Sequence, residues 1–118
     1  MMYVSKASEA PREPISAAKG TFRQVLIGAE QAPHFAMRLF TIEPGGSMPE
    51  HTNTVEHEQY VIAGKARISI DGKEFIVEKD NVVFIPEGVP HWYENIGEED
   101  FRFLCMVPKK VDRIQLTG

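Results

Sequence analysis

Apolar and polar residues alternate along several short stretches of the chain, which is the pattern of β-strands with one buried face. In Lys65–Ile70, for example, Ala66, Ile68 and Ile70 share one face and polar residues occupy the other. Gly, Pro, Asp or Asn interrupts these stretches about every 8–12 residues, a spacing typical of sandwiches and barrels. The predicted strands are Phe22–Ile27, His34–Glu43, Ser47–Thr52, Glu56–Ala63, Lys65–Ile70, Lys73–Glu78, Val82–Ile85, His91–Asn95 and Phe101–Val107.

Three details of this pattern concern how individual strands end and pack. Asp71-Gly72 separates two predicted strands and suits the two positive φ angles of a type I′ hairpin turn. Pro44-Gly45-Gly46 is expected to end the strand that begins at His34. Val82–Ile85 is apolar throughout, as is typical of a strand that is buried on both faces.

The domain organisation follows from where the alternation begins. Residues 1–20 are mostly polar and contain Pro11 and Pro14, so they are expected to form an N-terminal arm, and residues 21–118 to form one domain. A chain of 118 residues can bury a single core, and no convincing helical period follows the arm. Many short strands in one domain hide their edges by closing into a barrel or a double-sheet roll. The sequence therefore predicts an all-β fold.

The composition of the chain argues against nucleic acid and membranes as binding partners. The net charge is −4, and Lys and Arg are scattered apart from a small cluster at Lys109, Lys110 and Arg113. A nucleic-acid-binding surface would show a basic stripe with aromatic residues, and a membrane helix would need about 20 apolar residues in a row. The first residues lack the features of a secretory signal, and Cys105 is the single cysteine. We expect a cytoplasmic protein that binds neither nucleic acid nor membranes.

Three of the four histidines lie at corners of the predicted barrel. His51 follows Pro49, His57 starts the next strand, and His91 follows the turn Pro86–Pro90. Metal ligands must converge within about 2.0–2.2 Å of one ion, and prolines and glycines at such corners fix the backbone for that purpose. Convergence in space is not visible in a sequence, so ordinary surface or core histidines remain the alternative.

The segment GGSMPEHTNTVEHEQYVIAG, from Gly45 to Gly64, resembles the first motif of the cupin superfamily. That motif runs Gly, five residues, His, one, His, three or four, Glu, six, Gly. Here His51 takes the first histidine position, Asn53 the second, and His57 the acidic one.

The second cupin motif is Gly, five residues, Pro, one, Gly, two, His, three, Asn. Pro86, Gly88, His91 and Asn95 match it in register, whereas Asp80 replaces its first glycine. The resemblance implies a double-stranded β-helix, or jelly-roll barrel, of the small all-histidine cupin type. It does not specify a reaction, because one fold hosts many functions.

The resemblance also implies one divalent transition metal on His51, His57 and His91. Imidazole suits Mn, Fe, Ni, Zn and Cu, so the sequence does not select the metal. Asn53 is the main departure, since an amide oxygen is a weaker ligand than imidazole. It either coordinates, holds a water or turns away. His34 lies outside both motifs, and Glu56 and Glu58 are expected to face away from His57 by strand alternation.

Alternation extends the inward face beyond the histidines. Gln59 shares the face of His57, Tyr93 shares that of His91, and Phe103 and Cys105 share one face of the last strand. Arg38 would offer a bidentate donor for a substrate carboxylate if it points inward, and would otherwise be a surface cation. We therefore expect Arg38, Gln59, Tyr93, Phe103 and Cys105 to line a small-molecule site.

Three functions are consistent with this sequence. The first is a metal-dependent dioxygenase or isomerase acting on a small anionic or enolisable molecule. The second is a non-catalytic module that binds a sugar or metabolite, and the third is a structural barrel that has lost its metal through Asn53. Small cupins commonly form homodimers, and the resemblance implies such a partner, with Tyr3 and Val4 of the arm apolar enough to dock.

Overall fold

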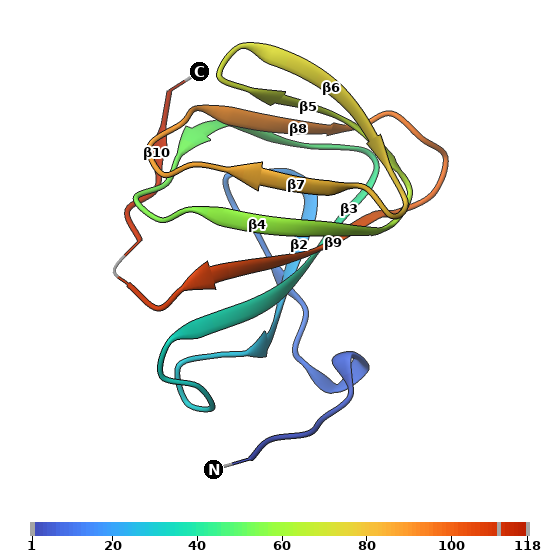
Figure 1. The fold of residues 1–118 in the computed structure, drawn as a ribbon. Helices are drawn as coiled ribbons and strands as arrows, with labels where there is room; N and C mark the ends of the chain where they lie inside the picture. Colours follow the sequence, from blue (N-terminus) through green and yellow to red (C-terminus); the bar gives the residue numbers. More distant parts are fainter. Residues whose placement is uncertain (1, 111, 118) are drawn as a thin grey trace.

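The computed structural model describes residues 2–110 and 112–117, and β-strands dominate it (Figure 1). In this part of the chain the only helical element is one 3₁₀ turn, η1 (Ala7–Glu9). The strands are β1 (Glu13–Pro14), β2 (Lys19–Ile27), β3 (Phe35–Thr52), β4 (His57–Ala63), β5 (Lys65–Ile70), β6 (Lys73–Glu78), β7 (Val82–Ile85), β8 (His91–Asn95), β9 (Phe101–Pro108) and β10 (Gln115–Leu116). The all-β prediction is confirmed.

The strands form one antiparallel sheet that curls around a common core. Its order is β6-β5-β8-β3-β9-β4-β7, with β2 and β10 also pairing with β3 and β1 pairing with β2. Figure 1 shows β6, β5 and β8 stacked on one side and β7 and β4 beside them, so that the two ends of the sheet curl toward each other. This is the arrangement of a jelly-roll barrel, as predicted.

Strand β3 belongs to both halves of the barrel. Its first part pairs with β2 and β9, and its last part pairs with β8 and β10. The prediction that Pro44-Gly45-Gly46 ends this strand is wrong, because the chain stays extended through it as far as Thr52. Gly45 has a φ of +80°, and a Cβ at Gly46 would lie 2.7 Å from the carbonyl oxygen of Lys19. The glycines thus bend the strand without ending it.

The core lies between the two halves, and β9 shows its pattern most clearly. Phe101, Phe103, Cys105 and Val107 are buried, and the residues between them are half-buried. This confirms the predicted inward face of the last strand. Burying a large apolar side chain contributes about 1.5–3 kcal/mol, so this face stabilises the barrel substantially.

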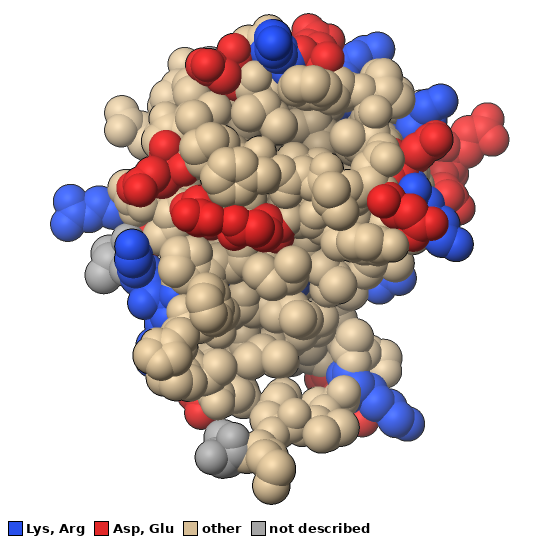
Figure 2. Space-filling model, viewed as in Figure 1, with Lys and Arg blue, Asp and Glu red and all other residues tan. Residues whose placement is uncertain are grey.

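Strand β7 corrects another expectation. It pairs only with β4 and forms an edge, and Val82 and Phe84 are 74% and 56% exposed. The prediction that Val82–Ile85 is buried on both faces is therefore wrong, because only Val83 and Ile85 face the core. Figure 2 shows broad uncharged areas over this side of the barrel, with Lys, Arg, Asp and Glu side chains in scattered groups.

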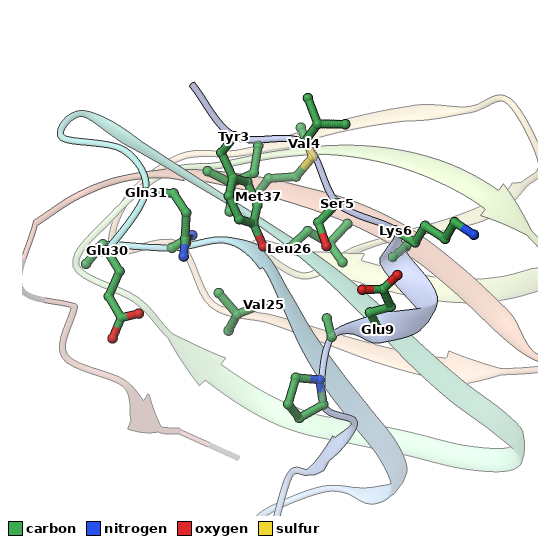
Figure 3. Close-up of a pocket in the computed structure, with 16 residues that line it drawn as sticks. Tyr3, Val4, Ser5, Lys6, Glu9, Val25, Leu26, Glu30, Gln31 and Met37 are labelled. Atoms are coloured by element: carbon green, nitrogen blue, oxygen red, sulfur yellow. Dashed lines mark hydrogen bonds between the residues drawn. The ribbon is translucent and has the colours of Figure 1, made fainter. Parts of the chain in front are cut away.

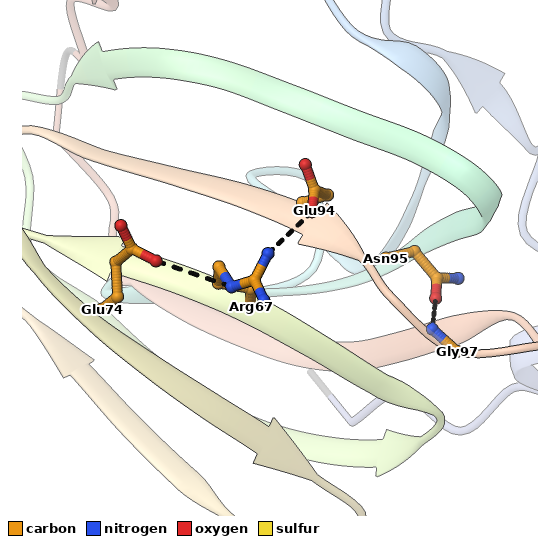
Figure 4. A network of polar contacts seen from close by, with 5 residues as sticks. All are labelled: Arg67, Glu74, Glu94, Asn95 and Gly97. Atoms are coloured by element: carbon orange, nitrogen blue, oxygen red, sulfur yellow. Dashed lines mark hydrogen bonds and ion pairs between the residues drawn. The ribbon is translucent and has the colours of Figure 1, made fainter.

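Turns and polar contacts complete the barrel. Asp71 and Gly72 have φ angles of 52° and 79°, which confirms the predicted hairpin geometry. Asn95, from the second motif, donates to the carbonyls of Ile42 and Glu99 and accepts from the Gly97 N–H at 2.8 Å (Figure 4). It thereby ties the β8–β9 turn to β3.

On the outer surface, Arg67 lies between Glu74 and Glu94, at 3.5 and 3.2 Å (Figure 4). Because these three side chains are well exposed, the pairs contribute little to stability.

The N-terminal residues run along the edge of β2. Glu13 and Pro14 of β1 pair with Arg23 and Phe22, and Gln24 donates to the carbonyls of Ala7 and Ala10. Strand β2 starts at Lys19, slightly before the boundary expected from the sequence. The described part of the chain contains no helix that is long and apolar enough to cross a membrane.

Candidate functional site

A cavity of about 150 Å³ lies inside the barrel, and every predicted site residue lines it except Cys105, for which the prediction is wrong. Strands β2, β3, β4, β8 and β9 supply most of its wall, and residues from both ends of the chain complete it. Its lining consists of Ile15, Ala17, Ala18, Arg23, Arg38, Phe40, Met48, Pro49, His51, Asn53, His57, Gln59, His91, Tyr93, Phe103, Ile114 and Leu116.

The three motif histidines share this cavity. His51 on β3 pairs directly with His91 on β8, and their ring centroids are 4.3 Å apart. His57, the first residue of β4, lies 5.8 Å from His91 between ring centroids. Residues from three strands and both motifs thus come together, as the sequence led us to expect.

Hydrogen bonds orient two of these imidazoles. The Nδ1 atoms of His51 and His91 each lie 2.9 Å from a backbone carbonyl two residues earlier, those of Pro49 and Val89. A carbonyl only accepts, so each Nδ1 is the donor, and in the neutral form of each ring the free lone pair is on Nε2. This tautomer is the one that lets Nε2 bind a metal.

His57 is held differently. Its Nδ1 lies 3.1 Å from the Sγ of Cys105, and its Nε2 is buried without a hydrogen-bond partner. Cys105 does not line the cavity but lies behind it, where Arg38 Nη2 also donates to the sulfur at 3.4 Å. The thiol therefore links a candidate metal ligand to a candidate anion-binding residue.

Buried polar atoms without hydrogen-bond partners concentrate at this cavity. Among the described residues they are Arg23 Nε, Arg38 Nε, Asn53 Oδ1 and His57 Nε2, and all four residues line it. An unsatisfied buried polar group costs about 1–3 kcal/mol, so such a concentration indicates a site that is completed by something bound there. The donor set fits a metal at His57 and Asn53, and an anion at the arginines.

The side-chain positions do not yet form a coordination sphere. Within residues 2–110 and 112–117, no group of three or more His, Cys, Asp or Glu side chains is placed to hold a metal ion. The metal site therefore stays a prediction, supported by the shared cavity, the tautomers and the unpartnered Nε2 of His57.

Asn53 has a partner that the sequence did not suggest. Its Nδ2 donates to Asp112 Oδ2 at 3.0 Å, and the Thr54 N–H donates to Asp112 Oδ1 at 3.0 Å. Asp112 thereby fixes the amide so that its oxygen is the atom left without a partner. Its distance in the sequence from either motif explains why it was missed.

Burial keeps the central imidazoles neutral. Desolvation, aided by the positive charge of Arg38, lowers the pKa of His57 to about 3. Desolvation also lowers the pKa of His91 to about 4, against the opposing effect of its hydrogen bond to Val89. Since only neutral imidazole binds a metal, both rings are in the required state at neutral pH.

The remaining predicted residues either line the cavity or hold a lining residue in place. Burial raises the pKa of the Tyr93 hydroxyl, which therefore stays neutral and accepts a hydrogen bond from Gln59 Nε2 at 2.7 Å. Phe103 stacks on the ring of Tyr93. Burial also raises the pKa of the Cys105 thiol. Arg38 points inward, which resolves the alternative that the sequence left open.

Several lining residues were not predicted. Arg23 lies on β2, whose inward face was not assigned from the sequence. The available signal was that Arg23 shares one face of the strand with Thr21 and Val25. Ile114 and Leu116 come from the C-terminal end of the chain. His34, Glu56 and Glu58 are absent from the lining, as expected.

A second and larger hollow, of about 770 Å³, lies between the arm and β2 (Figure 3). Tyr3 and Val4 face it from the arm, and Val25 and Leu26 face it from β2. Its lining contains neither histidine nor cysteine, so the motif residues do not contribute to it.

Comparisons with known proteins agree with the geometry. The family model described as "Cupin domain" matches residues 38–107. The solved structure of the polyketide cyclase RemF from Streptomyces resistomycificus superposes with a TM-score of 0.92 at 28% identity, covering 100% of this chain and 87% of that one. A predicted oxalate decarboxylase from Thermotoga maritima superposes with a TM-score of 0.80 at 25% identity, covering 90% and 98%.

Curated relatives show the same domain in different settings. An oxalate-binding protein from Thermotoga maritima is 30% identical over 88% of this chain and 92% of its own length. Mannose-1-phosphate guanylyltransferase from Escherichia coli is 36% identical over 57% of this chain, which spans only 14% of that protein. With a family model matching more than half of its length and both motifs built into one barrel, the chain belongs to the cupin family.

Proposed function

We propose that this cupin binds one divalent transition metal through His51, His57 and His91 and acts on a small anionic or enolisable molecule. The observation that carries the proposal is the buried, unpartnered Nε2 of His57, in a cavity shared with two imidazoles of matching tautomer. Asn53 Oδ1 is a fourth candidate ligand.

The residues around the metal position would bind and orient the ligand. A divalent metal supplies Lewis acidity that polarises a carbonyl or carboxylate oxygen. Arg38 offers its guanidinium to an anionic group, while Phe40, Phe103 and Met48 provide apolar walls. The ring of Tyr93 lies edge-on to the ring of His91, with centroids 5.9 Å apart, and its neutral hydroxyl accepts from Gln59.

The volume of the cavity favours a small ligand. One water molecule occupies about 30 Å³, so 150 Å³ accommodates roughly five to eight non-hydrogen atoms. The relatives include both an oxalate-binding protein and a polyketide cyclase. A short carboxylate or oxo acid fits this space, whereas a multi-ring polyketide exceeds it.

Elemental analysis of protein purified without chelators tests the metal, and turnover assays with small oxo and carboxylic acids test the activity. We expect about one Mn, Fe, Ni, Zn or Cu ion per chain, and turnover that is lost with a chelator and restored by metal. A protein that contains no metal and takes none up would contradict the proposal and favour a structural barrel that has lost its metal.

A non-catalytic binding module is the second candidate, and the composition of the cavity favours it. No Asp or Glu is among the described residues that line the cavity, and Tyr93 is held neutral, so an obvious general base is missing. Stabilisation of the fold by a small carboxylate without any turnover would support this alternative.

We also propose that the chain forms a homodimer. Tyr60, Val82 and Phe84 leave 40%, 74% and 56% of their surfaces exposed on β4 and the edge strand β7, where an unpaired strand is available for contact. Val4 of the arm is 97% exposed. Light scattering is expected to give twice the chain mass, and the mass of a monomer at micromolar concentration would contradict the dimer.

A further inference from the structure

We propose that Arg23 and Arg38 together form a two-guanidinium subsite that holds a second anionic group of the ligand. The ligand would then be a short molecule with two anionic ends, such as a small dicarboxylate. Its metal-bound end rests on the proposed function, whereas the guanidinium end does not.

The register of β2 and β3 places both arginines on one face. Arg23 pairs directly with Phe40, and Arg38 lies two residues from Phe40 along the same strand. Paired residues share a face of the sheet, as do residues two apart, so both arginines point to the side of Phe40. Diagonal neighbours of this kind lie about 7–8 Å apart, within reach of one carboxylate for long side chains.

The protein leaves both guanidinium groups incompletely paired, Arg38 without a described carboxylate partner and Arg23 with one long ion pair. The Nε atoms of Arg23 and Arg38 are buried without hydrogen-bond partners. Arg38 donates to the Cys105 thiol and lies 5.1 Å from the centre of the Phe40 ring, contacts that supply no negative charge. Arg23 has a single carboxylate near it among the described ion pairs, Glu13 at 3.6 Å from its Nε.

Two cations side by side in a partly buried cavity are unfavourable unless an anion lies between them. Glu13 meets Arg23 only at 3.6 Å and from outside the cavity, and no carboxylate of the described residues lines the cavity, so a ligand is the natural source of an anion between the two arginines. Arginine is suited to this role because its planar fork binds a carboxylate through two parallel hydrogen bonds.

The four unpartnered atoms also differ in kind. The Nε atoms of Arg23 and Arg38 are donors, whereas Asn53 Oδ1 is an acceptor and His57 Nε2 faces a candidate metal position. His57 and Arg38 both contact Cys105 Sγ, so the two kinds of group are separated by little more than one side chain. The cavity is thus built for a short ligand, with one end at the imidazoles and the other at the arginines.

Calorimetric titration with malonate and with propionate tests the subsite, because the two acids have similar size and differ by one carboxylate. We expect the manganese-loaded protein to bind malonate at least about 10-fold more tightly than propionate. Arg23→Met is expected to weaken malonate binding by about 10- to 100-fold, the range for a lost charge-assisted hydrogen bond, and to leave propionate binding nearly unchanged. Arg23→Lys should fall between the two, since it keeps the charge and loses the fork.

Arg67→Met is the matched control, because Arg67 is a surface arginine with two exposed carboxylate partners and lies outside the cavity. It should bind both acids like the unmodified protein. Thermal unfolding of each variant verifies that the barrel is intact, and metal content verifies that the histidine end is unaffected.

Equal affinity of Arg23→Met and the unmodified protein for malonate would overturn the subsite, as would equal affinity for malonate and propionate or no binding of either. If the protein takes up no metal but still binds malonate in a manner that depends on Arg23, the metal proposal fails and the arginine subsite stands.

Discussion

Replacing His57 or His91 with alanine is expected to lower the affinity for a divalent metal by at least about 100-fold. Each replacement removes one of the three proposed nitrogen ligands, and two imidazoles alone are not expected to hold a transition metal firmly at neutral pH. Calorimetric titration with Mn²⁺ or Zn²⁺, together with the metal content of the purified variants, measures the loss. His57→Ala also removes the imidazole that contacts Cys105.

Two variants serve as comparisons for this experiment. His34→Ala changes an exposed histidine that is absent from the cavity lining, and should retain full metal affinity. Asn53→His restores the second histidine of the cupin motif and should raise the affinity if its amide is a weak ligand. Unchanged affinity in both His57→Ala and His91→Ala would show that the metal, if any, binds elsewhere.

Acidifying the metal-free protein from pH 7 to pH 5 is expected to reduce its free energy of unfolding by about 2–4 kcal/mol. Burial lowers the pKa values of His57 and His91 to about 3 and about 4, against 6.5 for both groups in the absence of burial. Below pH 6.5 the unfolded chain binds protons at these two positions and the folded chain does not, so protons favour unfolding. The stability that the two neutral, buried imidazoles contribute is fully present above pH 6.5 and decreases as the pH falls toward 4.

Urea titrations at a series of pH values measure this dependence. The double variant His57→Gln, His91→Gln removes both groups, and its stability should change much less between pH 7 and pH 5. Because a typical domain is stable by only about 5–15 kcal/mol, the expected loss is a large fraction of the total. A parallel decrease in the unmodified protein and the double variant would assign the effect to other groups.

The sequence predicted most of the barrel because its strands follow local rules. Alternation located β5 and β9, and the Asp71-Gly72 dipeptide identified a hairpin whose φ angles match. The two motifs located the histidines, since each motif combines a turn of fixed geometry with a side chain at a fixed offset. These features depend on residues that are close together along the chain.

What the sequence missed depends on contacts between distant segments. The continuity of β3 through Gly46 accompanies the close approach of Lys19. Val82 and Phe84 are exposed because no described segment covers the outer face of β7 and β4, where Tyr60 is exposed as well. Arg23 was missed because alternation shows which residues share a face but not which face is buried. Asp112 belongs to a segment that carries no motif and meets Asn53 only in the folded chain.

The bend in β3 fixes the distance between the arginine end and the histidine end of the cavity. One continuous strand carries Arg38 before the bend and His51 after it, so the backbone path through Gly46 sets the separation of the two ends of the cavity. Since a Cβ at Gly46 would collide with the Lys19 and Glu43 carbonyls, that path admits little adjustment. We therefore expect cupins that share the two motifs but differ at this bend to accept ligands of different length, even where the residues around the metal are identical.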